Sequence, residues 1–103
     1  MQEVQSDNLA EVLKDNPKAI VLFGAGWCGA CRLLKPKLSN IAKEQTDVTF
    51  LYVDAEKSPQ SRELADIQNL PTTAGYVNSK LLIQKIGSKE EAIQEIINEV
   101  TSN

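Results

Sequence analysis

The stretch Trp27-Cys28-Gly29-Ala30-Cys31 contains the only two cysteines of the chain, which stand three positions apart. An unbroken apolar run, Ala19–Phe23, comes shortly before it and predicts a buried strand. After it, apolar residues recur at helical spacing from Leu33 to Ala42 and predict a helix. A C-x-x-C pair between a strand and a helix is typical of thiol–disulfide redox chemistry.

The composition narrows the class of protein. The 103 residues fit a single domain, 1–103, and a hydrophobic content of 42% is enough for an ordinary core. Eleven Lys and Arg against 14 Asp and Glu give a net charge of -3, which offers no basis for nucleic-acid binding. No apolar run approaches the ~20 residues of a membrane span. Because the chain has no histidine, imidazole can neither transfer protons nor bind a metal ion here.

The first five residues, Met1–Gln5, lack the basic and apolar segments of a secretory signal peptide. We therefore expect a cytoplasmic protein. We also expect it to work as a monomer, with no cofactor and no membrane contact.

Periodicity, caps and proline positions predict the remaining elements. We expect helices over 7–15, 28–45 and 59–67, a last helix after Ser88, and strands over 19–24, 48–53, 72–77 and 81–86. A short edge strand is expected near Val4, and Asn78-Ser79 should form a hairpin turn. Pro36 should kink the second helix without ending it. The expected N-caps are Ser6 or Asp7, Ser58, and Ser88 in a capping box with Glu91.

The spacing and position of the cysteines favour a reversible disulfide. Residues i and i+3 of a helix have Cα atoms roughly 5–6 Å apart, which suits a disulfide. Free backbone N–H groups at the helix start favour a thiolate at Cys28, and C-x-x-C thiols in such positions have pKa values of about 3.5–7. We expect Cys28 to be the exposed, acidic thiol and Cys31 the shielded one.

Other interpretations of single residues remain open at this point. A purely structural disulfide would close a loop too small to contribute more than about 2 kcal/mol. A zinc or iron–sulfur site needs four ligands, so two cysteines would require a metal shared between two copies of the chain. Trp27 suits either a flat peptide-binding surface or the core. For Pro71 the residues alone favour a trans bond, since about 5–6% of X–Pro bonds in folded proteins are cis.

The chain resembles the thioredoxin family over essentially its whole length. The resemblance rests on the motif 27–31, on the basic Arg32 and the helical Pro36, on Leu70-Pro71-Thr72, and on Gly87 after the last strand. It implies a thioredoxin fold of the α/β class, with a central mixed β-sheet flanked by helices on both faces. It also implies thiol–disulfide exchange on client proteins, with electrons supplied by a thioredoxin reductase.

The resemblance further implies a role for each residue of the motif. Cys28 would be the attacking thiolate and Cys31 the resolving thiol, with Gly29 and Ala30 supporting the turn between them. Pro71 would be a cis residue that faces the sulfurs, which reverses the expectation from the residues alone. The substrate groove would be lined by Trp27, Leu70 and Gly87.

Four positions depart from the family pattern. Ala30 stands where proline is usual, which bears on the reduction potential. Leu22 replaces a buried aspartate beneath the cysteines, and Phe50 replaces a lysine near it, so acid and base are lost together. Gly24 replaces a frequent second tryptophan. Two alternatives to a reductase follow: an oxidant or isomerase of higher potential, and a redox-silent binding module with the same fold.

Overall fold

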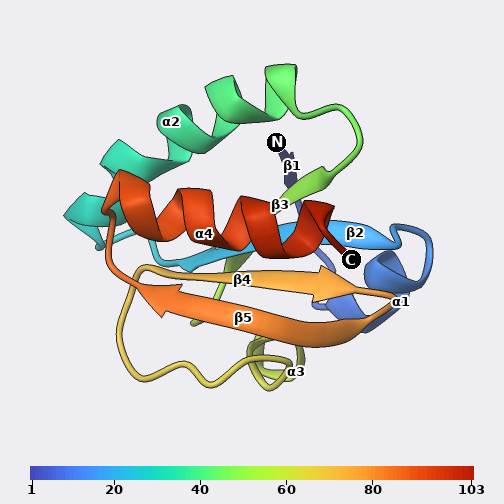
Figure 1. The fold of residues 1–103 in the computed structure, drawn as a ribbon. Helices are drawn as coiled ribbons and strands as arrows, with labels where there is room; N and C mark the ends of the chain where they lie inside the picture. The colour runs from blue at the N-terminus through green and yellow to red at the C-terminus, as the bar shows by residue number, and fades with distance from the viewer.

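A five-stranded mixed sheet forms the centre of the protein in a computed structural model that describes residues 1–103 (Figure 1). The strand order is β1-β3-β2-β4-β5. β1 and β2 both pair parallel with β3, whereas β4 runs antiparallel to β2 and β5 antiparallel to β4. The strands are β1 (Gln2–Glu3), β2 (Lys18–Gly24), β3 (Thr49–Asp54), β4 (Thr72–Val77) and β5 (Lys80–Ile86).

Four helices cover the two faces of this sheet, as the resemblance implied. They are α1 (Leu9–Lys14), α2 (Gly29–Glu44), α3 (Pro59–Arg62) and α4 (Glu90–Thr101). Figure 1 shows α2 and α4 together on one side of the sheet, with α1 and α3 on the other. Two buried apolar clusters lie between the layers, one beneath α1 and α3 and the other beneath α2 and α4. None of the helices is long and apolar enough to cross a membrane.

β2 lies in the middle of the sheet and is buried along nearly its whole length, from Ala19 to Gly24. Alternate side chains go to opposite clusters: Val21 and Phe23 pack beneath α1, whereas Ile20 and Leu22 pack beneath α2 and α4. The unbroken apolar run is therefore confirmed as a strand covered on both faces. Because β2 is fixed so firmly, the chain leaves the sheet at a defined point directly before the cysteines.

α2 is one continuous helix with Pro36 inside it, as predicted. Leu34 and Leu38, on either side of the proline, are both buried against the sheet. Proline has no backbone N–H, so one hydrogen bond of the helix is missing at Pro36. The packing of these two leucines keeps the helix continuous there. The hairpin prediction is also confirmed, because Asn78 and Ser79 both have positive φ, as a two-residue turn between antiparallel strands requires.

The predicted N-cap of the first helix is wrong, whereas Ser58 is the N-cap residue of the third helix as predicted but makes no side-chain bond, and both results have a tertiary cause. α1 begins after Asn8, and the carboxylate of Asp7 instead accepts hydrogen bonds from the backbone N–H groups of Gln60 and Ser61 at the start of α3. In return, the Ser61 hydroxyl accepts from the N–H of Leu9 at 3.1 Å. The two helix starts therefore cap each other, and Ser58 makes no capping bond. Burial opposes ionisation of Asp7, but the amide donors of Ser61 and Gln60 outweigh it and lower the pKa of this carboxyl.

Two further boundaries differ from the predictions. α3 ends at Arg62 rather than near 67, and residues 63–71 form turns and irregular chain. At α4 the N-cap residue is Lys89 and makes no side-chain bond, so the capping box of Ser88 and Glu91 does not form. The acidic first turn, Glu90 and Glu91, instead complements the positive end of the helix dipole.

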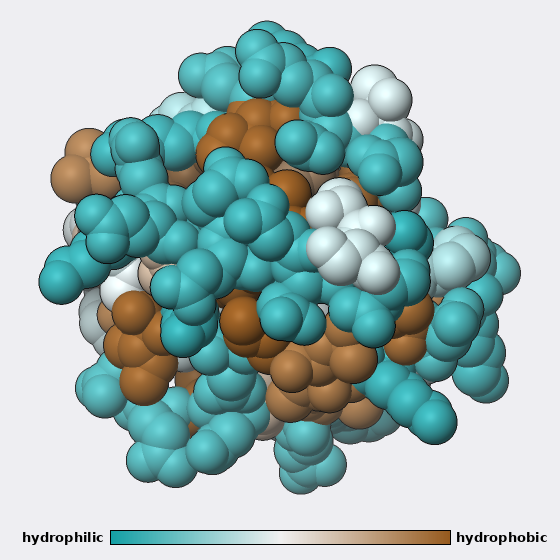
Figure 2. Space-filling model, viewed as in Figure 1, coloured by the Kyte–Doolittle hydropathy of each residue, from teal (hydrophilic) through white to brown (hydrophobic).

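β5 is one of the two exposed edges of the sheet. All seven of its residues are exposed or half-buried, and its large exposed apolar side chains are Leu81, Leu82 and Ile86. Figure 2 shows brown hydrophobic patches over the β4–β5 hairpin on an otherwise mainly hydrophilic face. β5 ends at the left of the view in Figure 1, where α2 also begins.

We predict that Gly75→Ala destabilises the protein by about 1–3 kcal/mol, the usual cost of overpacking. A Cβ atom at this position of β4 would lie 2.6 Å from Cγ2 of Val100 and 3.1 Å from Cγ2 of Ile96, so α4 would have to move. Urea denaturation measures the loss. The control is Gly26→Ala, whose Cβ would meet no atom within 4 Å and which should stay within about 0.5 kcal/mol of the parent. Equal stability of all three proteins would contradict the tight packing of α4 on β4.

Candidate active site

The two cysteines lie where the chain passes from β2 into α2. Cys28 is the N-cap residue of α2 and has an extended backbone, and Cys31 is in the first turn. The Sγ atom of Cys28 accepts a hydrogen bond from the backbone N–H of Cys31 at 3.2 Å. The two Cα atoms are 5.3 Å apart and the side chains form a disulfide. The geometry predicted from the i, i+3 spacing is therefore confirmed.

Both cysteines are largely covered in this oxidised state. The exposed fraction is 5% for Cys28 and 2% for Cys31, and the pair packs with Ala25 and Leu70. Cys28 is the more accessible of the two, and its exposure as a free thiol stays a prediction for the reduced protein. In the disulfide the sulfur of this N-cap residue folds back over the helix start instead of pointing into solvent.

Pro71 and its neighbours approach the disulfide from a distant part of the sequence. The Leu70–Pro71 peptide bond is cis, as the resemblance implied. Leu70 packs against the cysteine cluster, and the carbonyl of Pro71 accepts from the N–H of Gly87 at 2.9 Å. Gly87 has φ +100°, a conformation that favours glycine. The fold therefore packs Leu70 against the cysteine pair and joins Gly87 to the neighbouring Pro71.

Trp27 lies on the surface and not in the core. Its exposed fraction is 66%, and its indole N–H donates to the carboxylate of Glu56 at 2.7 Å. This hydrogen bond holds a large flat ring beside the cysteines while leaving most of it open to solvent. The interpretation of Trp27 as a core residue is therefore wrong, and a surface for an apolar partner segment remains.

The electrostatics of the helix start favour negative charge on sulfur. The first turn of α2 contains no acidic residue, so nothing opposes the positive end of the helix dipole. Arg32 donates to the carbonyl of Gly26 at 2.8 Å, which fixes the loop that precedes Cys28 and adds a positive charge nearby. Gly29 and Ala30 carry no bulk over the sulfurs, and a Cβ at Gly29 would meet nothing within 4 Å.

No acid or base lies at position 22 or 50. Leu22 and Phe50 are both buried in the apolar cluster beneath α2 and α4. Across the sheet, the register partner of Leu22 on β4 is Thr73, whose buried hydroxyl has no hydrogen-bond partner. The acid and base that the resemblance would place here are thus replaced by an apolar setting and not by another carboxylate at the same place.

Tyr52 is a residue of this site that the sequence analysis missed. It is the β3 register partner of Leu22 and lines a hollow of about 150 Å³ together with Cys31 and Lys35. The alternation of side chains along β3 was the available signal, because it places Tyr52 on the same face as Phe50. Because Tyr52 is far from the cysteines in the sequence, no local pattern indicates that it lies near them.

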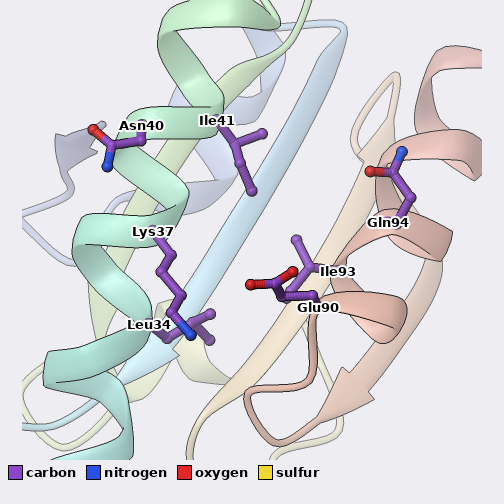
Figure 3. A pocket seen from close by; sticks show the side chains of 7 residues that line it. All are labelled: Leu34, Lys37, Asn40, Ile41, Glu90, Ile93 and Gln94. Carbon is purple, nitrogen blue, oxygen red and sulfur yellow. The ribbon is translucent and has the colours of Figure 1, made fainter.

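A second hollow, of about 300 Å³, lies between α2 and α4 and includes neither cysteine. Figure 3 shows Ile41 and Ile93 extending into it from the two helices, with Lys37 and Glu90 on opposite sides. It is a shallow gap above the core and contains no group of nucleophilic or metal-binding side chains. Nowhere in the structure do three or more His, Cys, Asp or Glu side chains gather as metal ligands would.

Comparison with known proteins places this site in a family. The family model described as Thioredoxin matches residues 1–99. The chain belongs to the thioredoxin family. The thioredoxin of Geodia cydonium is 37% identical over 90 residues, which cover 84% of this chain and 85% of that protein. The thioredoxin of Chlamydia trachomatis serovar D is 31% identical over 91 residues, 88% of each chain.

Solved thioredoxin structures have the same fold. The X-ray structure of Fasciola hepatica thioredoxin superimposes with a TM-score of 0.88 at 25% identity, covering 97% of this chain and 99% of that one. Chlamydomonas reinhardtii thioredoxin f2 superimposes with a TM-score of 0.85 at 29% identity, covering 96% and 94%. Family, fold and a C-x-x-C pair at disulfide distance together identify a protein-disulfide oxidoreductase.

We predict that Cys31→Ser accumulates a stable mixed disulfide between Cys28 and a client protein. Without a second sulfur nothing can displace the client from Cys28. Non-reducing gel electrophoresis with mass spectrometry detects the adduct, and Cys28→Ser is the matched control that should form none. Normal turnover by Cys31→Ser, or an adduct in the Cys28→Ser control, would contradict these roles.

Proposed function

We propose that this protein reduces disulfide bonds in client proteins in the cytoplasm, works as a monomer and regains its electrons from a thioredoxin reductase. The observation that carries the proposal is the position of the disulfide, which lies at a helix start between the exposed ring of Trp27 and the Leu70–Pro71 segment. A single chain supplies both sulfurs and the flanking surface, so no second copy is needed.

The reaction would proceed in two exchanges. The Cys28 thiolate attacks one sulfur of a client disulfide, a Cys28–client bond forms, and the other client sulfur leaves as a thiolate that takes up a proton. Cys31 then loses its proton and attacks the Cys28 sulfur, which releases the second client thiolate and forms the Cys28–Cys31 disulfide. Two electrons pass to the client, and the reductase returns two electrons to the cysteine pair.

The surface around the disulfide suits an extended client segment. Trp27 offers an exposed apolar ring next to Cys28, Leu70 packs against the cysteine pair, and Gly87 bonds to the neighbouring Pro71. A client strand lying between them could bond to backbone groups in the manner of an added β-strand. Cytoplasmic location is supported by the chemistry, because disulfides in that compartment are usually transient and catalytic.

Reduction of insulin by dithiothreitol tests this proposal. The protein should accelerate the reaction, and Cys28→Ser should abolish the acceleration. We further predict that Trp27→Ala lowers kcat/KM for insulin by about fivefold to tenfold, the range for losing an aromatic contact residue. The rate with a small aromatic disulfide should change little, because such a substrate does not span the groove.

The matched control is Leu81→Ala, which also removes an exposed apolar side chain but near the opposite end of β5 from Gly87. It should match the parent with both substrates. Failure of the parent protein to accelerate insulin reduction would overturn the proposed function and point to a redox-silent binding module. Equal insulin kinetics for Trp27→Ala and the parent would remove Trp27 from the docking surface.

A further inference from the structure

Gly24 opens a gap that joins the Cys31 sulfur to the hydroxyl of Tyr52. A Cβ atom at Gly24 would lie 3.0 Å from the Sγ of Cys31, 3.0 Å from the hydroxyl oxygen of Tyr52 and 3.0 Å from its ring carbon Cε1. The sulfur and the hydroxyl oxygen are therefore separated by no more than twice that distance. Any larger residue at this position would have to push one of them away.

The sheet register explains why Tyr52 is the residue that reaches this gap. Gly24 and Leu22 are neighbours on one face of β2, and their register partners on β3 are Asp54 and Tyr52. Leu22 is fully buried and has no hydrogen-bonding group. Tyr52 thus brings a hydroxyl on this face to the same Gly24 position that the Cys31 sulfur approaches.

Lys35 lies over the face of the Tyr52 ring and fixes its position. Its ammonium nitrogen lies 4.1 Å from the centre of the ring, and it also forms an ion pair with Glu3 of β1. Hydrogen bonding and charge attraction from Lys35 lower the pKa of Glu3, so this carboxyl group is ionised at neutral pH. Cys31, Lys35 and Tyr52 together line the hollow of about 150 Å³, which is wide enough for water.

We propose that the Tyr52 hydroxyl donates a hydrogen bond to the Cys31 sulfur as it becomes a thiolate, directly or through one water in this hollow. Lys35 acts as a positioning residue that holds the ring and adds positive charge. In the step concerned, the Cys31 proton leaves to water, the Cys31 thiolate attacks the Cys28 sulfur, and the bond between Cys28 and the client breaks. The client sulfur departs with the electron pair of that bond and takes up a proton.

Tyr52 remains a donor over the working range of pH. Burial, with smaller contributions from Asp54 and Glu3, raises the pKa of its hydroxyl above the ordinary value, so the group stays protonated. Its role is therefore to stabilise a charge on sulfur and not to act as a phenolate base. The charged groups that face Tyr52 and this hollow are Glu3, Arg32, Lys35, Asp54 and Lys57.

Stopped-flow reaction of the reduced protein with 5,5'-dithiobis(2-nitrobenzoate) tests the proposal. The first release of nitrothiobenzoate reports attack by Cys28, and the second reports attack by Cys31 on the mixed disulfide. Tyr52→Phe should slow the second release about tenfold at neutral pH, as expected for one hydrogen bond to a charged group, and leave the first unchanged. The pH midpoint of the second phase should rise by about one unit, so that the two proteins converge at high pH.

Two further variants complete the test. Tyr76→Phe removes a hydroxyl from the opposite side of the sheet, where it donates to the carbonyl of Leu64, and should leave both phases unchanged. Gly24→Ala should slow the second phase, because its Cβ would crowd Cys31 and Tyr52 apart. An unchanged second phase in Tyr52→Phe would overturn the proposal. So would equal slowing at every pH, since that is the signature of a purely structural role.

Discussion

The hydrogen bond from the Cys31 N–H to the Cys28 sulfur is the interaction on which the rest of the site depends. It exists because β2 is buried on both faces and releases the chain at Gly24, so that α2 begins one residue after Cys28. The sulfur of an N-cap residue takes the place that a serine or aspartate oxygen usually fills. The backbone N–H of Cys31, in the first turn of α2, therefore also stabilises negative charge on the Cys28 sulfur.

Much of this arrangement follows from local patterns. The apolar run of β2, the helical spacing through Pro36 and the three-position spacing of the cysteines each depend on near neighbours, and each prediction is confirmed. The cis bond before Pro71 is different, since the residues alone favour trans and only the resemblance to thioredoxins predicted it. Gly87 and Leu70 likewise reach the site through the sheet and not through any local signal.

The predictions that were wrong involve contacts between distant segments. Ser6 or Asp7 is the predicted cap of the first helix, yet Asp7 caps α3 while Ser61 of α3 bonds back to α1, an exchange across more than 50 positions. The place of Tyr52 in the site could not be predicted for a similar reason. Only the register of β2 against β3 shows that a glycine on one strand makes room for a tyrosine on the next. Helix and strand propensities and capping patterns describe one segment at a time, so they cannot predict contacts between distant segments.

The most direct test of this account is the pH dependence of Cys28 alkylation by iodoacetamide in the reduced Cys31→Ser variant, which retains a single thiol. The account predicts a half-maximal rate at least about one pH unit below the value of about 8.5 for an ordinary cysteine. The same variant unfolded in guanidinium chloride should return to the ordinary value, because the helix start is then lost. A folded midpoint at or above that of the unfolded chain would contradict the central claim that the start of α2 holds Cys28 ready as a thiolate.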